Sequence, residues 1–233
     1  MLSLANLESN LSLIKRRLEH SAKQSCRLTE EIQIIAVTKG FPGIIWKKTL
    51  QLSLSCIGES RIQEISLKSD TFISKNKIEL HLIGRLQSNK ARKAVELTDV
   101  IQTVDSIKLA SRLNKIAEEY DKKQRIYLQV NTAMDSEKAG FSPLEIFPAA
   151  EKIADYKHVV LEGIMTIPSN RYTQANLQSV YAQTRRIRDQ IQQKIKPSCA
   201  SLSMGMSGDF ETAIKEGATH IRLGTAIFGP RPL

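Results

Sequence analysis

Lys39 is the residue of this chain whose position most suggests chemistry. It ends an apolar run, residues 34–38, that has the composition of a buried strand. A lysine amine forms a Schiff base with an aldehyde or ketone once its surroundings lower its pKa. Position alone leaves a second interpretation open, in which Lys39 simply reaches solvent where the strand ends.

A second group of candidate residues follows the last two apolar runs of the sequence. Ser207 precedes a helical pattern, and Gly224 and Thr225 follow the final run. Glycine allows backbone N–H groups to approach an anion closely, and a helix N-terminus adds further donors. The pattern fits a phosphate site and fits equally an alternative in which Ser207 is only a helix cap and the glycines are only turns.

Arg222 completes this set of candidate residues. Strand alternation places it on the face opposite Ile221 and Leu223. An inward-facing arginine needs an acceptor, which is either a carboxylate such as Glu59 or Asp209 or a ligand's ring nitrogen or anion. A lysine for an aldehyde, a cradle for a phosphate and an arginine for a ring nitrogen together describe pyridoxal 5′-phosphate (PLP).

The elements that must position these residues alternate along the chain. Eight apolar, β-prone runs are separated by helical patterns, and residues 3–23 form an additional amphipathic helix. This order predicts an α/β fold, a closed (β/α)8 barrel forming a single domain over residues 1–233, with an open doubly wound sheet as the alternative. Barrel sites collect at the carboxyl ends of the strands, where the candidates above fall. The predicted strands are 33–38, 56–58, 78–83, 100–103, 126–131, 160–164, 201–204 and 220–223, and the clearest helices are 106–120, 143–155, 173–194 and 209–216.

Composition excludes several classes of protein. No apolar run approaches the roughly 18 residues of a membrane span, and the N-terminus lacks a signal-peptide core, so a cytoplasmic protein is expected. The net charge of +10 raises a nucleic-acid hypothesis, but basic residues are interleaved with acidic ones and aromatic content is only 5%. We therefore expect no nucleic-acid partner. The cysteines and histidines show no ligand spacing, so no metal site is predicted.

Several sequence blocks carry a family resemblance. The chain resembles the pyridoxal phosphate homeostasis protein family over essentially its whole length. The blocks are 36–39 (AVTK), 58–64 (GESRIQE), 81–90 (HLIGRLQSNK), 102–106 (QTVDS), 163–167 (GIMTI), 202–207 (LSMGMS) and 221–229 (IRLGTAIFG).

This resemblance implies a barrel similar to the N-terminal domain of bacterial alanine racemase. It implies that Lys39 carries PLP covalently, that Arg222 faces the pyridine nitrogen, and that the phosphate is held at the last two strand ends. The predicted cofactor-binding residues are Lys39, His81, Met165, Ser207, Arg222, Gly224 and Thr225.

The resemblance also implies a role in intracellular PLP homeostasis, by buffering or delivering the cofactor, with indirect effects on amino-acid and keto-acid balance. We expect a monomer without catalytic residues, because the C-terminal domain that gives alanine racemase its second acid/base group has no counterpart here. Apo PLP-dependent enzymes are the expected protein partners. A small PLP-dependent racemase-like enzyme is the alternative.

Two residues bear on the predicted cofactor contacts. Ser60 stands where the family usually has asparagine, and its shorter side chain would reach less far toward the cofactor. Lys138 follows the fifth predicted strand and is a second lysine near a strand end. We interpret it as a loop residue rather than as a Schiff-base lysine.

Overall fold

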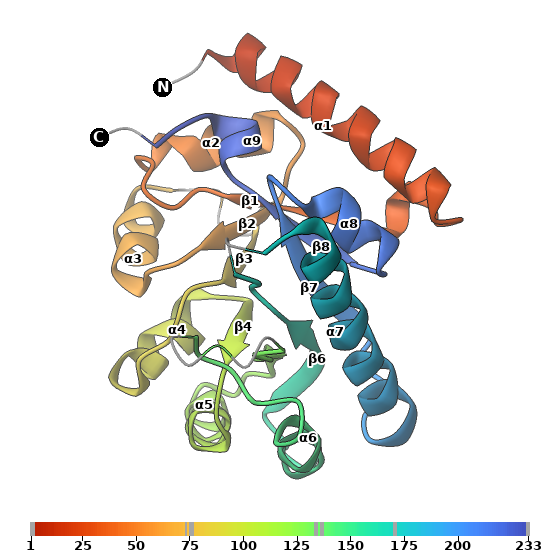
Figure 1. The fold of residues 1–233 in the computed structure, drawn as a ribbon. Coiled ribbons are helices and arrows are strands. Elements are labelled where there is room, and N and C mark those ends of the chain that lie inside the picture. Colours follow the sequence, from red (N-terminus) through yellow and green to blue (C-terminus); the bar gives the residue numbers. More distant parts are fainter. Residues whose placement is uncertain are drawn as a thin grey trace.

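Eight parallel strands close into a barrel in the computed structural model (Figure 1). Each strand pairs with its sequence neighbours, and β1 also pairs with β8, so that Gln33 lies opposite His220. The predicted (β/α)8 barrel is confirmed and the open sheet is excluded. The strands are β1 (Gln33–Val37), β2 (Cys56–Glu59), β3 (Glu79–Leu82), β4 (Val100–Val104), β5 (Gln124–Gln129), β6 (Val159–Met165), β7 (Ser201–Met206) and β8 (His220–Leu223).

The structure describes residues 3–72, 74, 77–132, 135, 138–169 and 172–231. The first two and last two residues of the predicted 1–233 domain lie outside these ranges. Within them, no helix has the length and apolar character needed to cross a bilayer.

The helices surround the barrel, and the five that the sequence predicted are present. The helix predicted at 143–155 begins at Ile146, after a turn in which Ser142 and Glu145 exchange hydrogen bonds. The helices are α1 (Leu4–Gln24), α2 (Ile44–Gln51), α3 (Ile62–Thr71), α4 (Ala91–Leu97), α5 (Ile107–Glu119), α6 (Ile146–Ala154), α7 (Gln174–Lys194), α8 (Phe210–Lys215) and α9 (Thr225–Phe228), with 3-10 turns η1 (Thr29–Glu31) and η3 (Ser88–Lys90).

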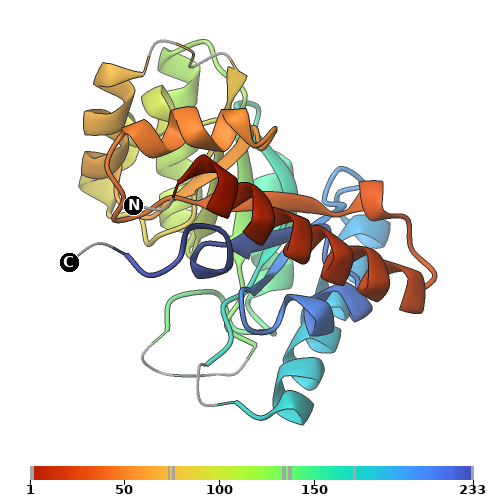
Figure 2. The same ribbon diagram turned by 90° about the horizontal axis from the view of Figure 1, so that it is seen from above.

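Helix α1 lies outside the ring of barrel helices and packs against α8 and α9 (Figure 2). The Ser3 hydroxyl accepts a hydrogen bond from the Asn6 N–H and caps the helix. Its apolar residues recur every three or four positions and are buried on one face. The additional N-terminal helix predicted from this spacing is confirmed, and it covers the last unit of the barrel.

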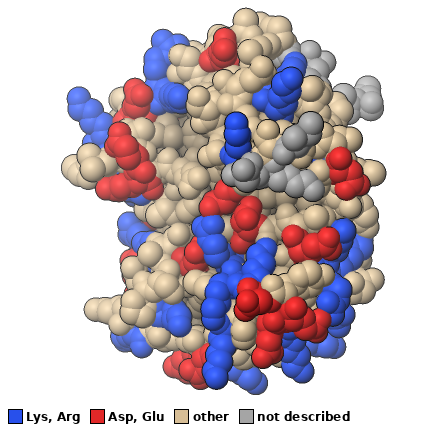
Figure 3. Space-filling model, turned by 180° about the vertical axis from the view of Figure 1, so that it is seen from behind, with Lys and Arg blue, Asp and Glu red and all other residues tan. Residues whose placement is uncertain are grey.

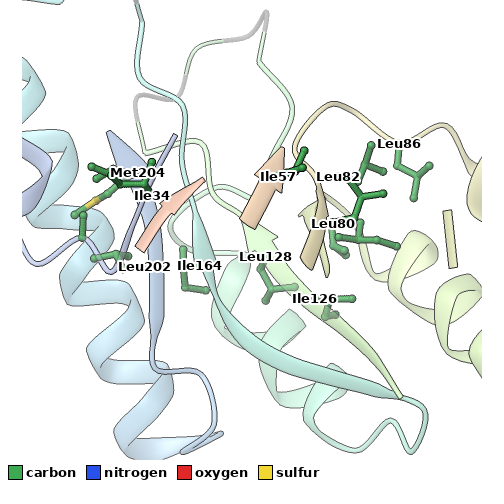
Figure 4. Close-up of a cluster of buried hydrophobic side chains, with 14 of the residues drawn as sticks. Ile34, Ile57, Leu80, Leu82, Leu86, Ile126, Leu128, Ile164, Leu202 and Met204 are labelled. Carbon is green, nitrogen blue, oxygen red and sulfur yellow. The ribbon is translucent and has the colours of Figure 1, made fainter. Parts of the chain in front are cut away.

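The core has two layers of different chemistry. Between the strands and the helices the side chains are mostly apolar, as the close-up in Figure 4 shows for Ile57, Leu128 and Met204. Inside the barrel, several buried residues are polar: His81, Gln102, Ser203, His220 and Arg222. Barrel interiors are more often filled with branched aliphatic side chains. This interior is therefore built around hydrogen bonds as well as packing.

The buried imidazole of His220 predicts acid sensitivity. Burial, and next the neighbouring His81, lower the pKa of His220 to about 4 from an ordinary 6.5. The unfolded chain therefore binds the proton first, and stability falls as pH drops from 6.5 toward 4. At 1.36 kcal/mol for each pKa unit the loss is about 3 kcal/mol. In urea denaturation between pH 4 and 7, His220→Gln should flatten this slope, whereas exposed His20→Gln should retain it. An unchanged slope in His220→Gln would contradict the prediction.

Candidate functional site

A cavity of about 370 Å³ opens at the carboxyl ends of the strands. This volume falls within the usual range of small-molecule sites, about 300–1,000 Å³. The wall brings together five of the seven predicted site residues: Lys39, Ser207, Arg222, Gly224 and Thr225. Its other lining residues are Val37, Phe41, Ser60, Ile83, Ile167, Met206, Gly208, Gly229 and Arg231.

Lys39 reaches the cavity from the first residues after β1 and is half-buried. Burial, followed by the charges of Arg231 and Arg222, lowers the pKa of Lys39 below its ordinary value. Glu59 and Glu64 act in the opposite direction but do not reverse the shift. A larger fraction of the amine is therefore neutral near pH 7 than in an exposed lysine, which favours attack on a carbonyl carbon.

A polar cluster lies behind Lys39, between the barrel and helices α2 and α3. Glu59 Oε1 accepts hydrogen bonds from Thr38 Oγ1 at 2.5 Å, Trp46 Nε1 at 3.1 Å and Lys68 Nζ at 2.6 Å. Burial raises the pKa of Glu59, and the adjacent Lys68 opposes that rise. Among the described atoms, Glu59 Oε2 has no hydrogen-bond partner. The carboxylate therefore serves to fix the end of β1 rather than to face the cavity.

The turn after β7 is arranged by hydrogen bonds from both sides. Asp209, and not Ser207, is the N-cap residue of α8, and its Oδ1 accepts from the Met206 N–H at 2.6 Å. Ser207 Oγ accepts from the Ala226 N–H at 3.2 Å, which joins this turn to the segment after β8. A Cβ added at Gly208 would meet no atom within 4 Å, so its backbone is open to the cavity. The interpretation of Ser207 as only a helix cap is therefore wrong.

The guanidinium of Arg222 is buried at the base of the cavity. Its two terminal nitrogens donate to Ser203 Oγ and to the Thr166 carbonyl oxygen, each at 2.8 Å. Over the described ranges no carboxylate forms an ion pair with Arg222, so the proposed pairing with Glu59 or Asp209 is not found. The charge is instead held by neutral acceptors, which leaves it available to an electron-rich group in the cavity.

A chain of hydrogen bonds continues from Arg222 through the barrel interior. Arg222 donates to Ser203 Oγ, so the hydroxyl hydrogen is free to donate to Gln102 Oε1 at 2.7 Å. The Gln102 amide nitrogen then donates to His81 Nδ1 at 2.7 Å, and His81 Nε2 donates to Glu79 at 2.6 Å. The fixed charge of Arg222 thus sets the direction of every bond and places the imidazole hydrogen on Nε2.

His81 and Met165 are not among the described lining residues of the cavity, so the structure does not bring these two predicted cofactor-binding residues together with the other five. Both side chains are completely buried inside the barrel. His81 is engaged by Gln102 and Glu79, and Met165 packs in a cluster with Val100 and Tyr127. Their places on inward-facing strand positions were predictable from alternation, but their depth below the rim was not.

Two other residues named from the sequence have clear positions. Ser60 lines the cavity at the position where the family usually has asparagine. Lys138 is not among the lining residues, and its Nζ donates to the Ile167 carbonyl oxygen at 3.0 Å. The sequence reasoning missed Phe41 and Arg231 because neither lies in a strand, and only the closed fold brings the C-terminal segment to Lys39.

One group of side chains outside the cavity has the composition of a metal site. Ligand atoms of Cys56, Glu79 and His81 lie within 4.8 Å of one another. The sequence predicted no such group because the residues have no ligand spacing. The Glu79 carboxylate already accepts from His81 and forms an ion pair with Arg125 at 2.6 Å. Hydrogen bonding thus accounts for this group without a cation.

Surface charge on the face opposite that of Figure 1 is mixed. Basic and acidic side chains are interspersed there, and no single continuous basic surface covers this face (Figure 3). Individual pairs such as Arg92–Glu119 and Lys93–Glu96 place opposite charges side by side. This face therefore lacks the continuous basic surface that is typical of a nucleic-acid interface.

Comparison with known proteins identifies the family. The model of the alanine racemase N-terminal domain matches residues 2–232. The pyridoxal phosphate homeostasis protein of Pasteurella multocida is 34% identical over 227 residues, which is 97% of each chain. The chain belongs to the pyridoxal phosphate homeostasis protein family.

Two solved structures place this family member in context. The structure of PipY from Synechococcus elongatus with PLP bound is 37% identical, with a TM-score of 0.82, covering 91% of this chain and 100% of that one. An alanine racemase of Clostridium difficile matches with a TM-score of 0.78 at 15% identity, covering 98% of this chain and 61% of the racemase. The second likeness shows the shared fold alone.

Proposed function

We propose that this protein binds PLP covalently on Lys39 and acts in PLP homeostasis, holding the cofactor reversibly and releasing it to apo PLP-dependent enzymes. One observation carries the proposal. The Lys39 amine lies in the wall of a cavity at the carboxyl ends of the strands, and its pKa is lowered there. The family membership and the PLP bound to PipY support the same ligand.

The cavity suits the charge of PLP. Three cationic side chains line it, Lys39, Arg222 and Arg231, and no acidic side chain is among its described lining residues. A phosphorylated aldehyde is an anion, and a cavity with this lining attracts it. Ser207 Oγ, the open backbone at Gly208 and the Gly224–Thr225 segment would hold the phosphate group. The residues present therefore fit the cofactor.

The proposed roles follow from the chemistry of each residue. Lys39 Nζ condenses with the aldehyde carbon of the cofactor, and one water leaves as the carbon–nitrogen bond forms. When bound, PLP supplies a conjugated ring that withdraws electrons from the attached carbon. Arg222 can only donate hydrogen bonds, so beside the ring nitrogen it keeps that nitrogen unprotonated and weakens this withdrawal. Such a site favours holding the cofactor over transforming an amino acid.

A direct test combines spectroscopy with chemical trapping. PLP added to the purified protein should give a visible absorbance, which borohydride reduction abolishes while fixing the cofactor to one peptide containing Lys39. Mixing the loaded protein with an apo PLP-dependent enzyme should restore that enzyme's activity. A loaded protein that never releases its cofactor would contradict the delivery role.

The racemase-like alternative is separated from this role by proton exchange at the Cα atom of amino acids. Family membership does not show whether the chain is catalytic. We expect no enzymatic rate of deuterium incorporation across a panel of amino acids in D₂O, measured by NMR. Steady exchange with any of them would favour the enzyme. The cytoplasmic location and the monomeric state remain predictions.

Replacing Ser207 tests the phosphate cradle. Ser207→Ala should weaken PLP binding by roughly 10- to 100-fold, because a hydrogen bond to a charged group contributes about 1.5–3 kcal/mol. Pyridoxal, which lacks the phosphate, should bind the variant and the wild type equally. Fluorescence titration of both ligands measures the difference. An equal loss for the two ligands would show that Ser207 does not recognise the phosphate.

A further inference from the structure

The peptide groups on both sides of Lys39 are held by charged side chains of α3. Lys68 Nζ donates to the Thr38 carbonyl oxygen at 2.8 Å, immediately before Lys39. Glu64 Oε1 accepts from the Gly40 N–H at 2.5 Å, immediately after it. Both side chains lie behind the cavity and are absent from its lining. The segment that carries the reactive amine is therefore clamped from outside the site.

The two side chains also bind each other. Lys68 Nζ lies 2.8 Å from Glu64 Oε1 and 2.6 Å from Glu59 Oε1, and its side chain is only 4% exposed. All three ammonium hydrogens thus have acceptors: two carboxylates and the Thr38 carbonyl oxygen. A buried charge is costly unless it is fully hydrogen-bonded. The arrangement consequently has one low-energy geometry, and that geometry fixes the backbone at Lys39.

The turn at Lys39 depends on this support. The backbone of Gly40 has a φ of +76°, a conformation that residues other than glycine rarely adopt. On its other side, a Cβ added at Gly40 would lie 3.0 Å from the Arg231 side chain. The exposed Gly40 backbone thus has Glu64 on one side and Arg231 on the other. Movement of either neighbour would alter how the amine enters the cavity.

We propose that Glu64 and Lys68 are positioning residues that aim Lys39 into the cavity by clamping the peptide groups on both sides of it. This inference rests on the proposed covalent function of Lys39. The same ion-paired cluster contributes to the charge that Lys39 experiences. The charged groups that act on the Lys39 amine are Glu59 on β2, Glu64 on α3, Arg222 on β8 and Arg231 in the C-terminal segment.

The sign of the electrostatic effect can be stated for two of these groups. Glu64 raises the pKa of Lys39 and Arg231 lowers it. Removing the negative charge in Glu64→Gln should therefore move the titration of Lys39 to lower pH. Arg231→Gln should move it to higher pH. A purely structural role for either residue would not produce shifts of opposite direction.

The experiment first measures Lys39 without any cofactor. Acetylation of Lys39 by acetic anhydride, followed by mass spectrometry between pH 6 and 11, gives the midpoint of its titration. Glu64→Gln retains an acceptor for the Gly40 N–H and removes only the charge, whereas Glu64→Ala removes both. The control is the exposed pair on α4, with Lys93→Met and Glu96→Gln, which should keep the wild-type midpoint.

The second measurement is the rate at which borohydride traps PLP on Lys39. Glu64→Gln should change the rate little at a pH matched to its midpoint. Glu64→Ala and Lys68→Met should be slower by about tenfold, the loss expected for a charge-assisted hydrogen bond. Lys68→Met leaves two carboxylates without their partner, so urea denaturation checks that this variant folds. If it does not fold, the two Glu64 variants alone test the positioning role.

The outcomes distinguish this inference from the proposed function. If both Glu64 variants kept the wild-type midpoint of Lys39 titration and the wild-type rate of PLP trapping, the positioning role would be overturned while PLP binding stayed intact. Slower acetylation of Lys39 in Glu64→Ala than in Glu64→Gln at matched pH, together with no trapping of PLP even by the wild type, would reject the PLP function and retain the clamp around Lys39.

Discussion

Lys39→Ala is expected to abolish covalent PLP attachment completely. The variant should show no visible absorbance after incubation with PLP and no cofactor-bearing peptide after borohydride reduction. The reason is geometric, since Lys39 is the one lysine among the described lining residues of the cavity. Its removal leaves no amine there to form the carbon–nitrogen bond. Absorbance spectra and peptide mapping measure the result.

The matched control for this prediction is Lys138→Ala. Burial lowers the pKa of Lys138 as well, but its Nζ is bound to the Ile167 carbonyl oxygen and it does not line the cavity. The control should attach PLP like the wild type. Persistent attachment in Lys39→Ala, or its loss in Lys138→Ala, would mean that the wrong lysine has been assigned.

Non-covalent binding gives a second readout on Lys39→Ala. The groups proposed to hold the phosphate and the ring are all present in this variant, so PLP should still bind, more weakly and reversibly. Fluorescence titration would detect this residual binding. It would separate the contribution of the covalent bond from that of the proposed phosphate cradle, whose residues Ser207, Gly208, Gly224 and Thr225 line the cavity.

The strand order made the fold and the cavity predictable from the sequence. In a closed parallel barrel, residues at the carboxyl ends of all strands meet at one rim. Lys39, Ser207 and Arg222 are far apart in the chain, yet each follows or ends an apolar run, so their meeting could be inferred. Helices α2, α3, α4 and α9 were not among the clearest predicted helices, and α9, with only four residues, has too few turns for a period.

The support behind the cavity could not be predicted in the same way. Glu64 and Lys68 have the spacing of an ordinary exposed ion pair on a helix, which contributes little. Their importance arises only because α3 packs beside the turn at Lys39. Similarly, strand alternation can place His81 on an inward face, but its hydrogen bonds to Gln102 and Glu79 depend on side-chain depth. Periodicity gives the face of a strand and not the distance below its rim.

The second large effect is expected for Gln102→Leu, at the centre of the hydrogen-bond chain below Arg222. Leucine can neither accept from Ser203 Oγ nor donate to His81 Nδ1, and both groups are buried. Each buried polar group left unpaired costs about 1–3 kcal/mol, so the loss should total roughly 2–6 kcal/mol. That is a large part of the ~5–15 kcal/mol that stabilises a typical domain.

Urea denaturation of Gln102→Leu measures this loss. The control is Gln190→Leu on the exposed side of α7, which should change the free energy of unfolding by no more than about 0.5 kcal/mol. The chain also predicts coupling, since Ser203→Ala removes the hydroxyl that Gln102 would leave unpaired. In a double-mutant cycle the combined variant should therefore lose less than the sum of the two single variants. Additive losses would show that Ser203 and Gln102 act separately, and the directed path from Arg222 to His81 would then not operate as a unit.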